Sequence, residues 1–311
     1  MTRIHIACSA RNAGRYLDAF FDSLVAQTQT DWELWIRDDG STDDTWARLQ
    51  SLRAREPRIV SSVRGSESRG AAQGFADVLA QLPGDARVIA TADADDVWMP
   101  HRLERTLAAL EEAQHTRPGP TLVHSDLTVV DDQLKPLALS FWRSEGVNPD
   151  SPSLRSLAIQ NVAVGPTLLF NAELLAELRT FPREAIHQDW WIALVAAVTG
   201  RLVAVHEPTV WYRQHASNTT AGARLGSIWS RLAGAWSVRA RVASDLDKTA
   251  QQAGALVERF GARMAPDDRH ELLGLASIAA LKGWRRRVAI ARWRWLAAHG
   301  VARNVGVVLR G

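Results

Sequence analysis

The stretch Val88-Ile89-Ala90-Thr91-Ala92-Asp93-Ala94-Asp95-Asp96-Val97-Trp98 decides the fold of this chain. Its first five residues are apolar apart from one threonine, which is typical of a strand buried on both faces of a parallel sheet. Three carboxylates follow within the next four residues. Open α/β sheets bind their ligands outside the carboxyl ends of the strands, so the sequence predicts a ligand site here.

The carboxylates of this stretch have a spacing that suits a divalent cation. Asp93 and Asp95 can aim two hard oxygen ligands at one point, as Mg²⁺ or Mn²⁺ requires when a phosphate shares the ion. A solvated turn is the alternative for an isolated Asp-x-Asp triplet. A calcium loop of the EF-hand type is excluded, because Val97 and Trp98 stand where an oxygen ligand and a glycine are needed.

Strands and helices alternate along the first hundred residues. We expect strands at 4–8, 32–37, 59–63 and 88–92 and helices between them, the second opened by a capping box of Ser41 and Asp44, the third preceded by a loop at 70–74. This order predicts an α/β fold with a doubly wound, mostly parallel sheet flanked by helices. Right-handed crossovers bring the first, second and fourth strand ends to one edge. That edge carries Asn12, Asp38 and Asp39 beside the Asp93–Asp96 cluster.

The charge of the chain is unevenly distributed. Residues 224–311 hold 16 Lys and Arg against 6 Asp and Glu, a balance of +10, and the remainder has a balance of −7. From Lys282 onward there are eight basic residues and no acid. We expect two domains, a catalytic one at 1–222 and a basic helical C-terminal region at 223–311. The basic region could meet an anionic membrane surface, pack on the catalytic domain, or contact a second subunit. Nucleic-acid binding is not expected, because no reading motif is present.

Several functional classes are excluded by what the sequence lacks. No Gly-x-Gly-x-x-Gly follows the first strand and no Gly-Lys-Ser/Thr loop occurs, which argues against dinucleotide oxidoreductases and P-loop enzymes. There is one cysteine, Cys8, so no disulfide can form within the chain. No signal peptide and no apolar span of roughly 20 residues is found. The expected location is the cytoplasm, with peripheral attachment to the inner face of the membrane as an option.

The motifs together resemble the inverting glycosyltransferases of family 2, which have the GT-A fold. The resemblance covers residues 3 to about 222, and its later motifs are similar to the bacterial branch described as rhamnosyltransferases of O-antigen synthesis. It is carried by Asn12 and by the runs at 37–45, 93–100, 165–171, 187–191 and 212–218. The chain departs from the family pattern at 9–11 and at Ser68, so the base of the nucleotide stays open.

The resemblance implies a role for individual residues. Asp38 matches the acid that contacts the nucleoside, and Asp93 and Asp95 match the Asp-x-Asp motif that binds donor and metal, with Asp95 as the direct ligand. Asp189 matches the catalytic base. The other residues implied in donor binding are Ala10, Asn12, Asp39 and Arg69.

The later motifs also have structural alternatives. Asp189 could simply be the N-cap of the next helix. Trp190 and Trp191 are adjacent, so one should pack inward while the other could stack on an acceptor sugar. His215 is a candidate metal ligand or a structural histidine. Arg213 could offset diphosphate charge or form a surface ion pair.

The sequence therefore predicts a Mn²⁺- or Mg²⁺-dependent inverting glycosyltransferase. The expected donor is dTDP-rhamnose, with a UDP-sugar as an option, and the expected acceptor is a glycan or lipid-linked glycan in cell-surface polysaccharide synthesis. A nucleotidyltransferase is the alternative among enzymes, although the loop from Ser9 to Gly14 matches one only in part. A binding module that keeps the nucleotide fold without catalysis is the alternative outside enzymes.

Overall fold

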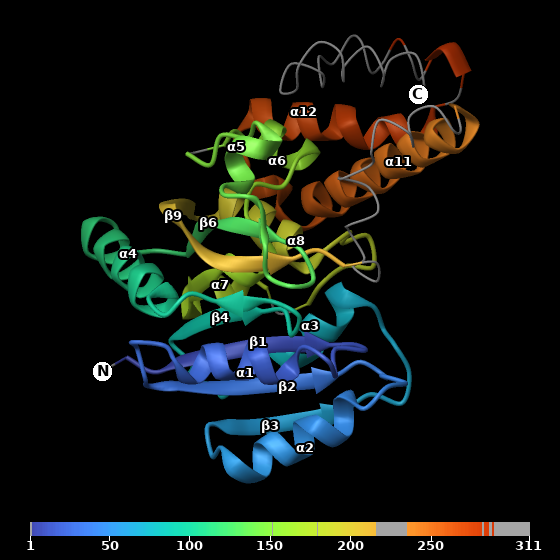
Figure 1. Cartoon of the computed structure of the whole chain (residues 1–311). Coiled ribbons are helices and arrows are strands. Elements are labelled where there is room, and N and C mark those ends of the chain that lie inside the picture. The colour runs from blue at the N-terminus through green and yellow to red at the C-terminus, as the bar shows by residue number, and fades with distance from the viewer. Residues whose placement is uncertain are drawn as a thin grey trace. The chain divides into compact units, whose positions relative to one another are not determined.

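The computed structural model describes residues 2–150, 152–178, 180–215, 235–281, 283–285 and 288, and only the backbone of residues 235–245 (Figure 1). The chain forms two compact units. The first comprises Met1–Ser151 with Val162–Gln214, and the second comprises Pro152–Asn161 with His215–Gly311.

The first unit begins with the alternation expected from the sequence. Its elements up to the carboxylate stretch are β1 (Ile4–Ala10), α1 (Leu17–Val25), β2 (Trp32–Asp38), α2 (Thr45–Arg55), β3 (Ile59–Arg64), α3 (Ala71–Leu79) and β4 (Val88–Ala92). Those that follow are β5 (Val97–Trp98), α4 (Arg102–Thr116), β6 (Thr121–Val130), β7 (Pro136–Ala138), α5 (Phe141–Glu145), η1 (Gly165–Thr167), β8 (Leu169–Asn171), α7 (Ala172–Glu177), α8 (Gln188–Thr199) and β9 (Arg201–Arg213).

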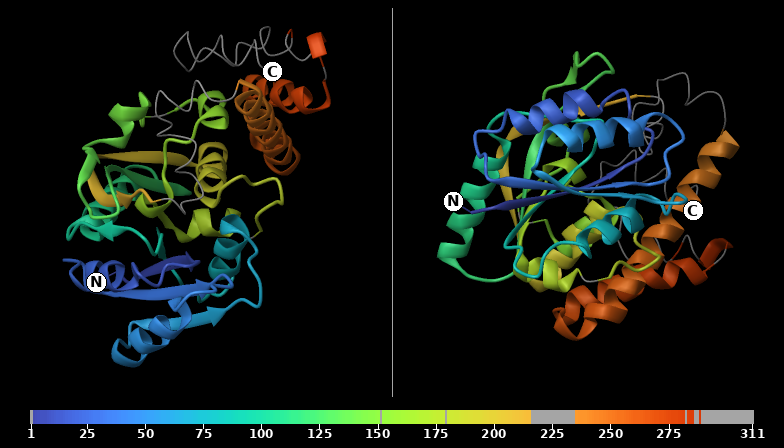
Figure 2. Two further views of the ribbon diagram at one scale, coloured as in Figure 1. Left: turned by 45° about the vertical axis from the view of Figure 1, so that its right-hand side comes forward. Right: turned by 90° about the horizontal axis from the view of Figure 1, so that it is seen from below.

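All strands of this unit belong to one sheet with the order β3-β2-β1-β4-β8-β6-β9-β5, and β7 pairs with β6. The pairs β1–β2, β1–β4 and β2–β3 are parallel. Beyond β4 the sheet is mixed, because β8 runs antiparallel to both β4 and β6 while β6 and β9 are parallel. Helices α1 and α2 cover one face and α3 and α8 the other (Figure 2, right). The α/β, doubly wound fold expected from the sequence is therefore confirmed, with a mixed second half.

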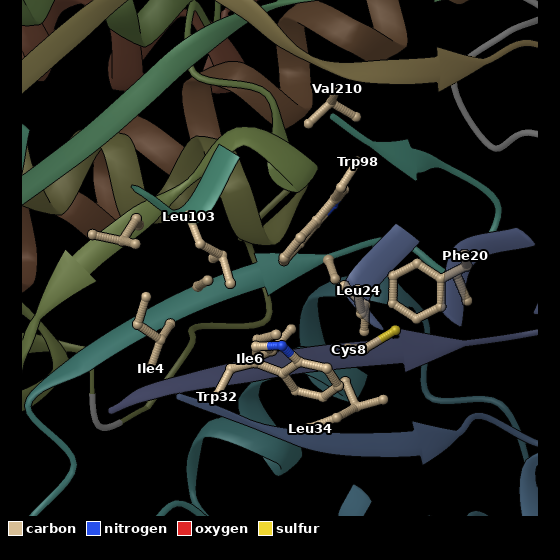
Figure 3. Close-up of a cluster of buried hydrophobic side chains, with 14 of the residues drawn as sticks. Ile4, Ile6, Cys8, Phe20, Leu24, Trp32, Leu34, Trp98, Leu103 and Val210 are labelled. Atoms are coloured by element: carbon tan, nitrogen blue, oxygen red, sulfur yellow. The ribbon is translucent and has the colours of Figure 1, made fainter. Parts of the chain in front are cut away.

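The core of the first unit lies between the sheet and α1. Phe20 and Leu24 of α1 are buried against β1, whose Cys8 is fully buried as well (Figure 3). The Phe20 ring meets Trp98 of β5 edge-on, with ring centroids 6.4 Å apart. The apolar spacing of α1, with residues three and four apart on one stripe, produces this packing.

Two local expectations are wrong. The capping box at the start of α2 does not form: the helix begins at Thr45, its N-cap Asp44 makes no side-chain cap bond, and the Ser41 hydroxyl accepts a hydrogen bond from the Asn12 amide instead. Gly74 lies inside α3 rather than in the loop before it, and a side chain there would collide with Ser9. In both cases a residue distant in the sequence is involved. Asn12 occupies the Ser41 hydroxyl, and Ser9 packs against Gly74.

The second unit is helical. Its elements are α6 (Leu154–Ile159), α11 (Ala235–Phe260), η2 (Gly261–Arg263), α12 (Pro266–Ser277) and η3 (Ile278–Ala280). Arg155 of α6 forms an ion pair with Glu271 of α12, so the short segment at 152–161 joins the C-terminal helices rather than the first unit. The expected boundary at 222/223 and most of the basic run from 282 to 311 lie outside the described residues. No described helix is both long and apolar enough to cross a membrane.

Candidate active site

The site lies where the chain changes direction on the sheet. From β1 the chain turns outward to β2 and β3, and from β3 it returns across to β4 on the other side of β1. Such a switch point opens a crevice outside the carboxyl ends of the two strands. Ala10 of β1 lies in register with Asp38 of β2, and Cys8 with Ala92 of β4, so the expected edge with Asn12, Asp38 and Asp93 is formed.

The loops after β1 and β2 are fixed to each other by hydrogen bonds. Asn12 has a left-handed backbone (φ 50°), a conformation that asparagine tolerates better than most residues. Its amide donates to the Ser41 hydroxyl at 2.9 Å, and its Oδ1 accepts from the Thr42 amide at 2.9 Å. The Gly14 amide donates to Asp43 at 3.1 Å. The loops after β1 and β2 are therefore held together by hydrogen bonds within the protein.

Asp39 holds the loop that precedes α3. Its carboxylate accepts hydrogen bonds from the Ser68 hydroxyl (2.8 Å) and from the amides of Arg69 (3.1 Å) and Gly70 (3.2 Å). Burial acts to raise the pKa of Asp39, but these bonds and that from Arg37 outweigh it and hold the pKa below its ordinary value. In this structure Asp39 thus anchors the loop of the predicted nucleotide pocket from within.

The other predicted donor-binding side chains are also engaged within the protein. Asp38 is completely buried and accepts a bond from the Ser41 amide at 3.0 Å. The Arg69 guanidinium makes a two-point contact with Asp77, at 2.8 and 2.9 Å. The Ala10 carbonyl accepts from the Asp39 amide at 2.8 Å. Sequence reasoning gave no role to Arg11, whose exposed side chain reaches Ser68 at 2.8 Å and leaves donors free for an anion.

The carboxylates after β4 carry concentrated negative charge. Burial raises the pKa of Asp93 well above its ordinary value, and the charges of Asp95 and Asp189 add to this. The pKa of Asp96 is raised in the same way, by burial first and then by Asp95 and Asp93. Asp96 is fully buried; its Oδ1 accepts the Arg213 amide at 2.8 Å, while its Oδ2 has no hydrogen-bond partner among the residues that the structure describes. A cation at this place would relieve the repulsion.

Arg213, at the end of β9, holds the carboxylate loop. Its Nε donates to the main-chain carbonyl of Asp95 at 2.8 Å and its Nη1 to that of Asp132 at 2.6 Å. The side chain is buried and stacks over the ring of Tyr16. Because it is buried, this side chain does not lie at the surface, as one alternative from the sequence supposed, and it shapes the loop that presents Asp95.

Asp189 lies beside Asp93 although nearly a hundred residues separate them. It is the second residue of α8, whose N-cap is His187, so it is not the cap itself. Its Oδ2 accepts the Gly165 amide at 2.9 Å and its Oδ1 the Trp190 amide at 2.7 Å. A methyl group built on Gly165 would lie 3.4 Å from Asp93 Oδ2 and 3.8 Å from Asp189 Cβ. The two acids thus face each other across one glycine.

The remaining predicted residues differ in what they can offer. Trp191 is completely buried, so its ring has no surface for an acceptor, whereas Trp190 is half-buried at the start of the same helix. This is the division expected for adjacent tryptophans. His215 is the first residue of the C-terminal segment of the second unit, and its role as a metal ligand stays a prediction.

The acids fit a divalent metal of the kind that a nucleotide brings with it. Within the part of the chain that the structure describes, no group of three or more His, Cys, Asp or Glu residues forms a ready-made metal cage. Magnesium commonly uses one or two carboxylates together with substrate phosphates, so a cage is not required. Asp93 and Asp95 could supply that donor set, and the pKa of Asp93 is raised by burial first and then by the neighbouring negative charges of Asp95 and Asp189.

Sequence reasoning missed three residues behind the acids. Thr91, on β4, donates to the Gly165 carbonyl. Gly165 was noted as part of a motif without a role. Arg102 is fully buried at the start of α4. The available signal for its burial was its position in the helix. Arg102 lies four residues before Thr106 and eight before Leu110, on the buried stripe of α4.

Comparison with known proteins agrees with this geometry. A doubly wound α/β sheet with paired acids at the switch point is a fold of the GT-A type. Residues 6–150, a little under half of the chain, match the model of the family described as "Glycosyl transferase family 2".

Two curated relatives are similar in sequence. An uncharacterized glycosyltransferase of Nostoc sp. is 27% identical over 223 residues, 70% of this chain and 66% of that protein. The Escherichia coli UDP-Glc:alpha-D-GlcNAc-diphosphoundecaprenol beta-1,3-glucosyltransferase WfgD is 31% identical over 107 residues, 34% of this chain and 40% of that protein. The alignments therefore span less than two thirds of either relative.

Two solved structures are similar in fold. S. aureus TarS in complex with UDP-GlcNAc has a TM-score of 0.59 at 14% identity, covering 99% of this chain and 82% of that one. The mannosyltransferase PcManGT from Pyrobaculum calidifontis, in complex with GDP-Man and Mn²⁺, has a TM-score of 0.50 at 15% identity, covering 99% and 85%. At this identity they support the fold alone.

Proposed function

We propose that this protein is an inverting glycosyltransferase that moves a sugar from a nucleotide-diphosphate donor to an acceptor hydroxyl. One observation carries the proposal: Asp189 lies beside Asp93 across Gly165, at the carboxyl end of β4. A transfer with inversion needs one group to hold the diphosphate and a second, separate group to take the acceptor proton. Asp93 and Asp95 would hold the diphosphate through a cation, and Asp189 would take the acceptor proton.

Asp95 and Asp93 would hold Mn²⁺ or Mg²⁺, which when bound neutralises the diphosphate and stabilises the departing nucleotide. Arg213 keeps the Asp95 main chain in place through its 2.8 Å bond. The walls built on Asn12 and Asp39 would orient the nucleoside, and Arg11 would meet its phosphates. The hydrogen bonds that shape these loops come largely from main-chain groups, so they do not determine which nucleoside base is bound.

Asp189 would act as the general base. A carboxylate tied to a cation is a poor proton acceptor, which leaves Asp189 rather than Asp93 or Asp95 for this role. Its two oxygens each accept one amide bond, at 2.9 and 2.7 Å, and keep further lone pairs free for an acceptor hydroxyl. The half-buried Trp190 beside it would stack on the acceptor sugar.

The finer specificity is proposed from the resemblance of the motifs. The sugar would be L-rhamnose carried by dTDP, with UDP-sugars as the second choice, and the acceptor a glycan or lipid-linked glycan of a cell-surface polysaccharide. WfgD and the solved relatives bear names with UDP- or GDP-linked sugars, so a donor panel must include those. The basic tail would attach the enzyme peripherally to an anionic membrane face.

The substitution Asp189→Asn tests the assignment of the base. It keeps the shape of the side chain but cannot accept the proton, so turnover should fall about 10²–10⁴-fold while donor affinity stays nearly unchanged. Single-turnover transfer with saturating donor and acceptor measures the effect. Glu184→Gln is the matched control, because Glu184 is an exposed acid in the segment just before α8.

The donor and acceptor for this experiment come from a panel of nucleotide sugars screened for Mn²⁺-dependent nucleotide release. Wild-type turnover in Asp189→Asn with loss in Glu184→Gln would transfer the base role to Glu184. Donor binding without any release or transfer in the wild-type protein would instead identify a binding module and end the proposal.

A further inference from the structure

We propose that Thr91, Gly165 and Arg102 together hold Asp189 in position relative to the carboxylates that follow β4. The inference rests on the proposed function, and it assigns roles to three residues that do not touch a substrate. All three lie in the first unit, on β4, η1 and the start of α4.

Both polar groups of Gly165 are used in this arrangement. Its amide donates to Asp189 Oδ2 at 2.9 Å, and its carbonyl accepts the Thr91 hydroxyl at 2.5 Å. Thr91 is completely buried on β4 and stands two residues before Asp93, which directly follows the strand. The strand that presents Asp93 therefore also holds, through one hydroxyl, the peptide that orients Asp189.

A side chain at Gly165 would be tightly placed. A methyl group there would lie 3.3 Å from Gln188 Nε2, tighter than most side-chain carbons approach a neighbour, and 3.4 Å from Asp93 Oδ2, at the edge of ordinary contact. Glycine serves close approach here rather than backbone freedom, since its φ is not in the left-handed region. Alanine at this position would press against the side chains of Gln188 and Asp93.

Arg102 clamps the same segment from behind. Its Nε donates to the Pro166 carbonyl at 2.9 Å, and its Nη2 donates to the carbonyls of Leu168 and Thr91, each at 3.1 Å. The guanidinium lies 3.5 Å from the ring centre of Trp98. Within the described residues it forms no salt bridge, and burial lowers its pKa to about 9.

Burying a cation without an acid partner carries a large desolvation free energy, and proteins rarely keep such a group for stability alone. Here the three carbonyls and the Trp98 ring offset part of that cost. In return the guanidinium joins β4 to the 165–168 turn by bonds to both. The strand β4 and the 165–168 turn, whose Gly165 amide holds Asp189, cannot then move apart without breaking several buried hydrogen bonds.

A pair of Thr91 variants separates positioning from bulk stability. Thr91→Val keeps the shape and removes the hydroxyl, whereas Thr91→Ser keeps the hydroxyl and removes a methyl group. With the donor and acceptor found by the panel, Thr91→Val should lower kcat on the order of tenfold to 10²-fold with donor KM within about twofold. Thr91→Ser should retain kcat near the wild-type value.

A second readout does not depend on turnover. The Gly165 amide proton, followed by hydrogen exchange in ¹H–¹⁵N spectra, should exchange more than about tenfold faster in Thr91→Val and stay protected in Thr91→Ser. Gly165→Ala, a second variant should Thr91→Val not fold, is expected to show the same selective loss of kcat.

The outcomes distinguish this inference from the proposed function. If the wild-type protein transfers sugar and Thr91→Val and Gly165→Ala keep its kcat, the positioning role is overturned and the proposed function stands. Equal losses in Thr91→Val and Thr91→Ser, or a rise in donor KM in place of the fall in kcat, also overturn it. A wild-type protein without any transfer overturns both.

Discussion

Asp95 is the side chain on which donor binding should depend most. It shares one short loop with Asp93 and Asp96, where burial raises the pKa of both and the charge of Asp95 raises it further. We expect Asp95→Ala to abolish Mn²⁺-dependent binding of a nucleotide diphosphate while the fold survives, because the cation loses its direct ligand. Calorimetric titration with UDP and with dTDP, each with Mn²⁺, measures this.

The control for Asp95→Ala is Asp85→Ala. Asp85 is exposed just before β4, at the opposite end of the same strand, and should leave the titration unchanged. Undiminished binding by Asp95→Ala would remove Asp95 from the metal site.

Single residues could be assigned from the sequence only where a motif fixed them. Asp93 and Asp95 were found because a strand and its end are local features. The inward direction of Asp39 was not found, since it depends on partners about thirty positions along the chain, and neither was the pairing of Arg69 with Asp77, which joins a loop to the next helix. One of the adjacent tryptophans was expected to pack inward, but not which. The approach of Asp93 and Asp189 to the same glycine was likewise beyond any local pattern.

Among the elements, β6 carries a histidine with a pH-dependent effect on stability. His124 is completely buried, and burial lowers its pKa to about 4, with His206 adding to the effect and Asp150 opposing it. Its ring stacks edge-on against Trp142, at 5.4 Å between centroids. The native protein thus keeps this imidazole neutral at a pH where an unfolded chain would protonate it.

Unfolding in urea at a series of pH values should reveal this effect. Because the unfolded histidine binds a proton below about pH 6.5 and the folded one only near 4, stability falls as the pH drops between these values, by about 3 kcal/mol for this group. His124→Leu should lack that part of the decline. Parallel pH profiles for both proteins would show that another group is responsible.

The first half of the sheet could be predicted from the sequence, and the second half could not. Strands β1 to β4 alternate with helices, and periodicity exposes such units. By contrast β8 has three residues and pairs antiparallel with β4 and β6, which no local pattern indicates. The missing capping box has the same origin: Ser41 accepts from Asn12, twenty-nine positions away.

For the whole molecule, the basic C-terminal run is the main feature without a structural assignment. Removing residues 282–311 should weaken association with anionic vesicles more than it lowers transfer to a soluble acceptor. The eight basic residues would contribute about 1 kcal/mol each near a charged surface before screening. Sedimentation with phosphatidylserine vesicles at two salt concentrations tests this, with neutral vesicles as the control. Failure of the full-length protein to sediment at low salt would exclude the membrane role.

Because Cys8 is buried, the rate at which it reacts with a thiol reagent reports how fast the surrounding structure opens. It is the one thiol of the chain, it lies in the central strand β1, and burial raises its pKa well above the ordinary value. A thiol reagent therefore finds no thiolate in the native state. Labelling has to wait until β1 separates from α1, so in excess reagent its rate is limited by the opening of this part of the first unit.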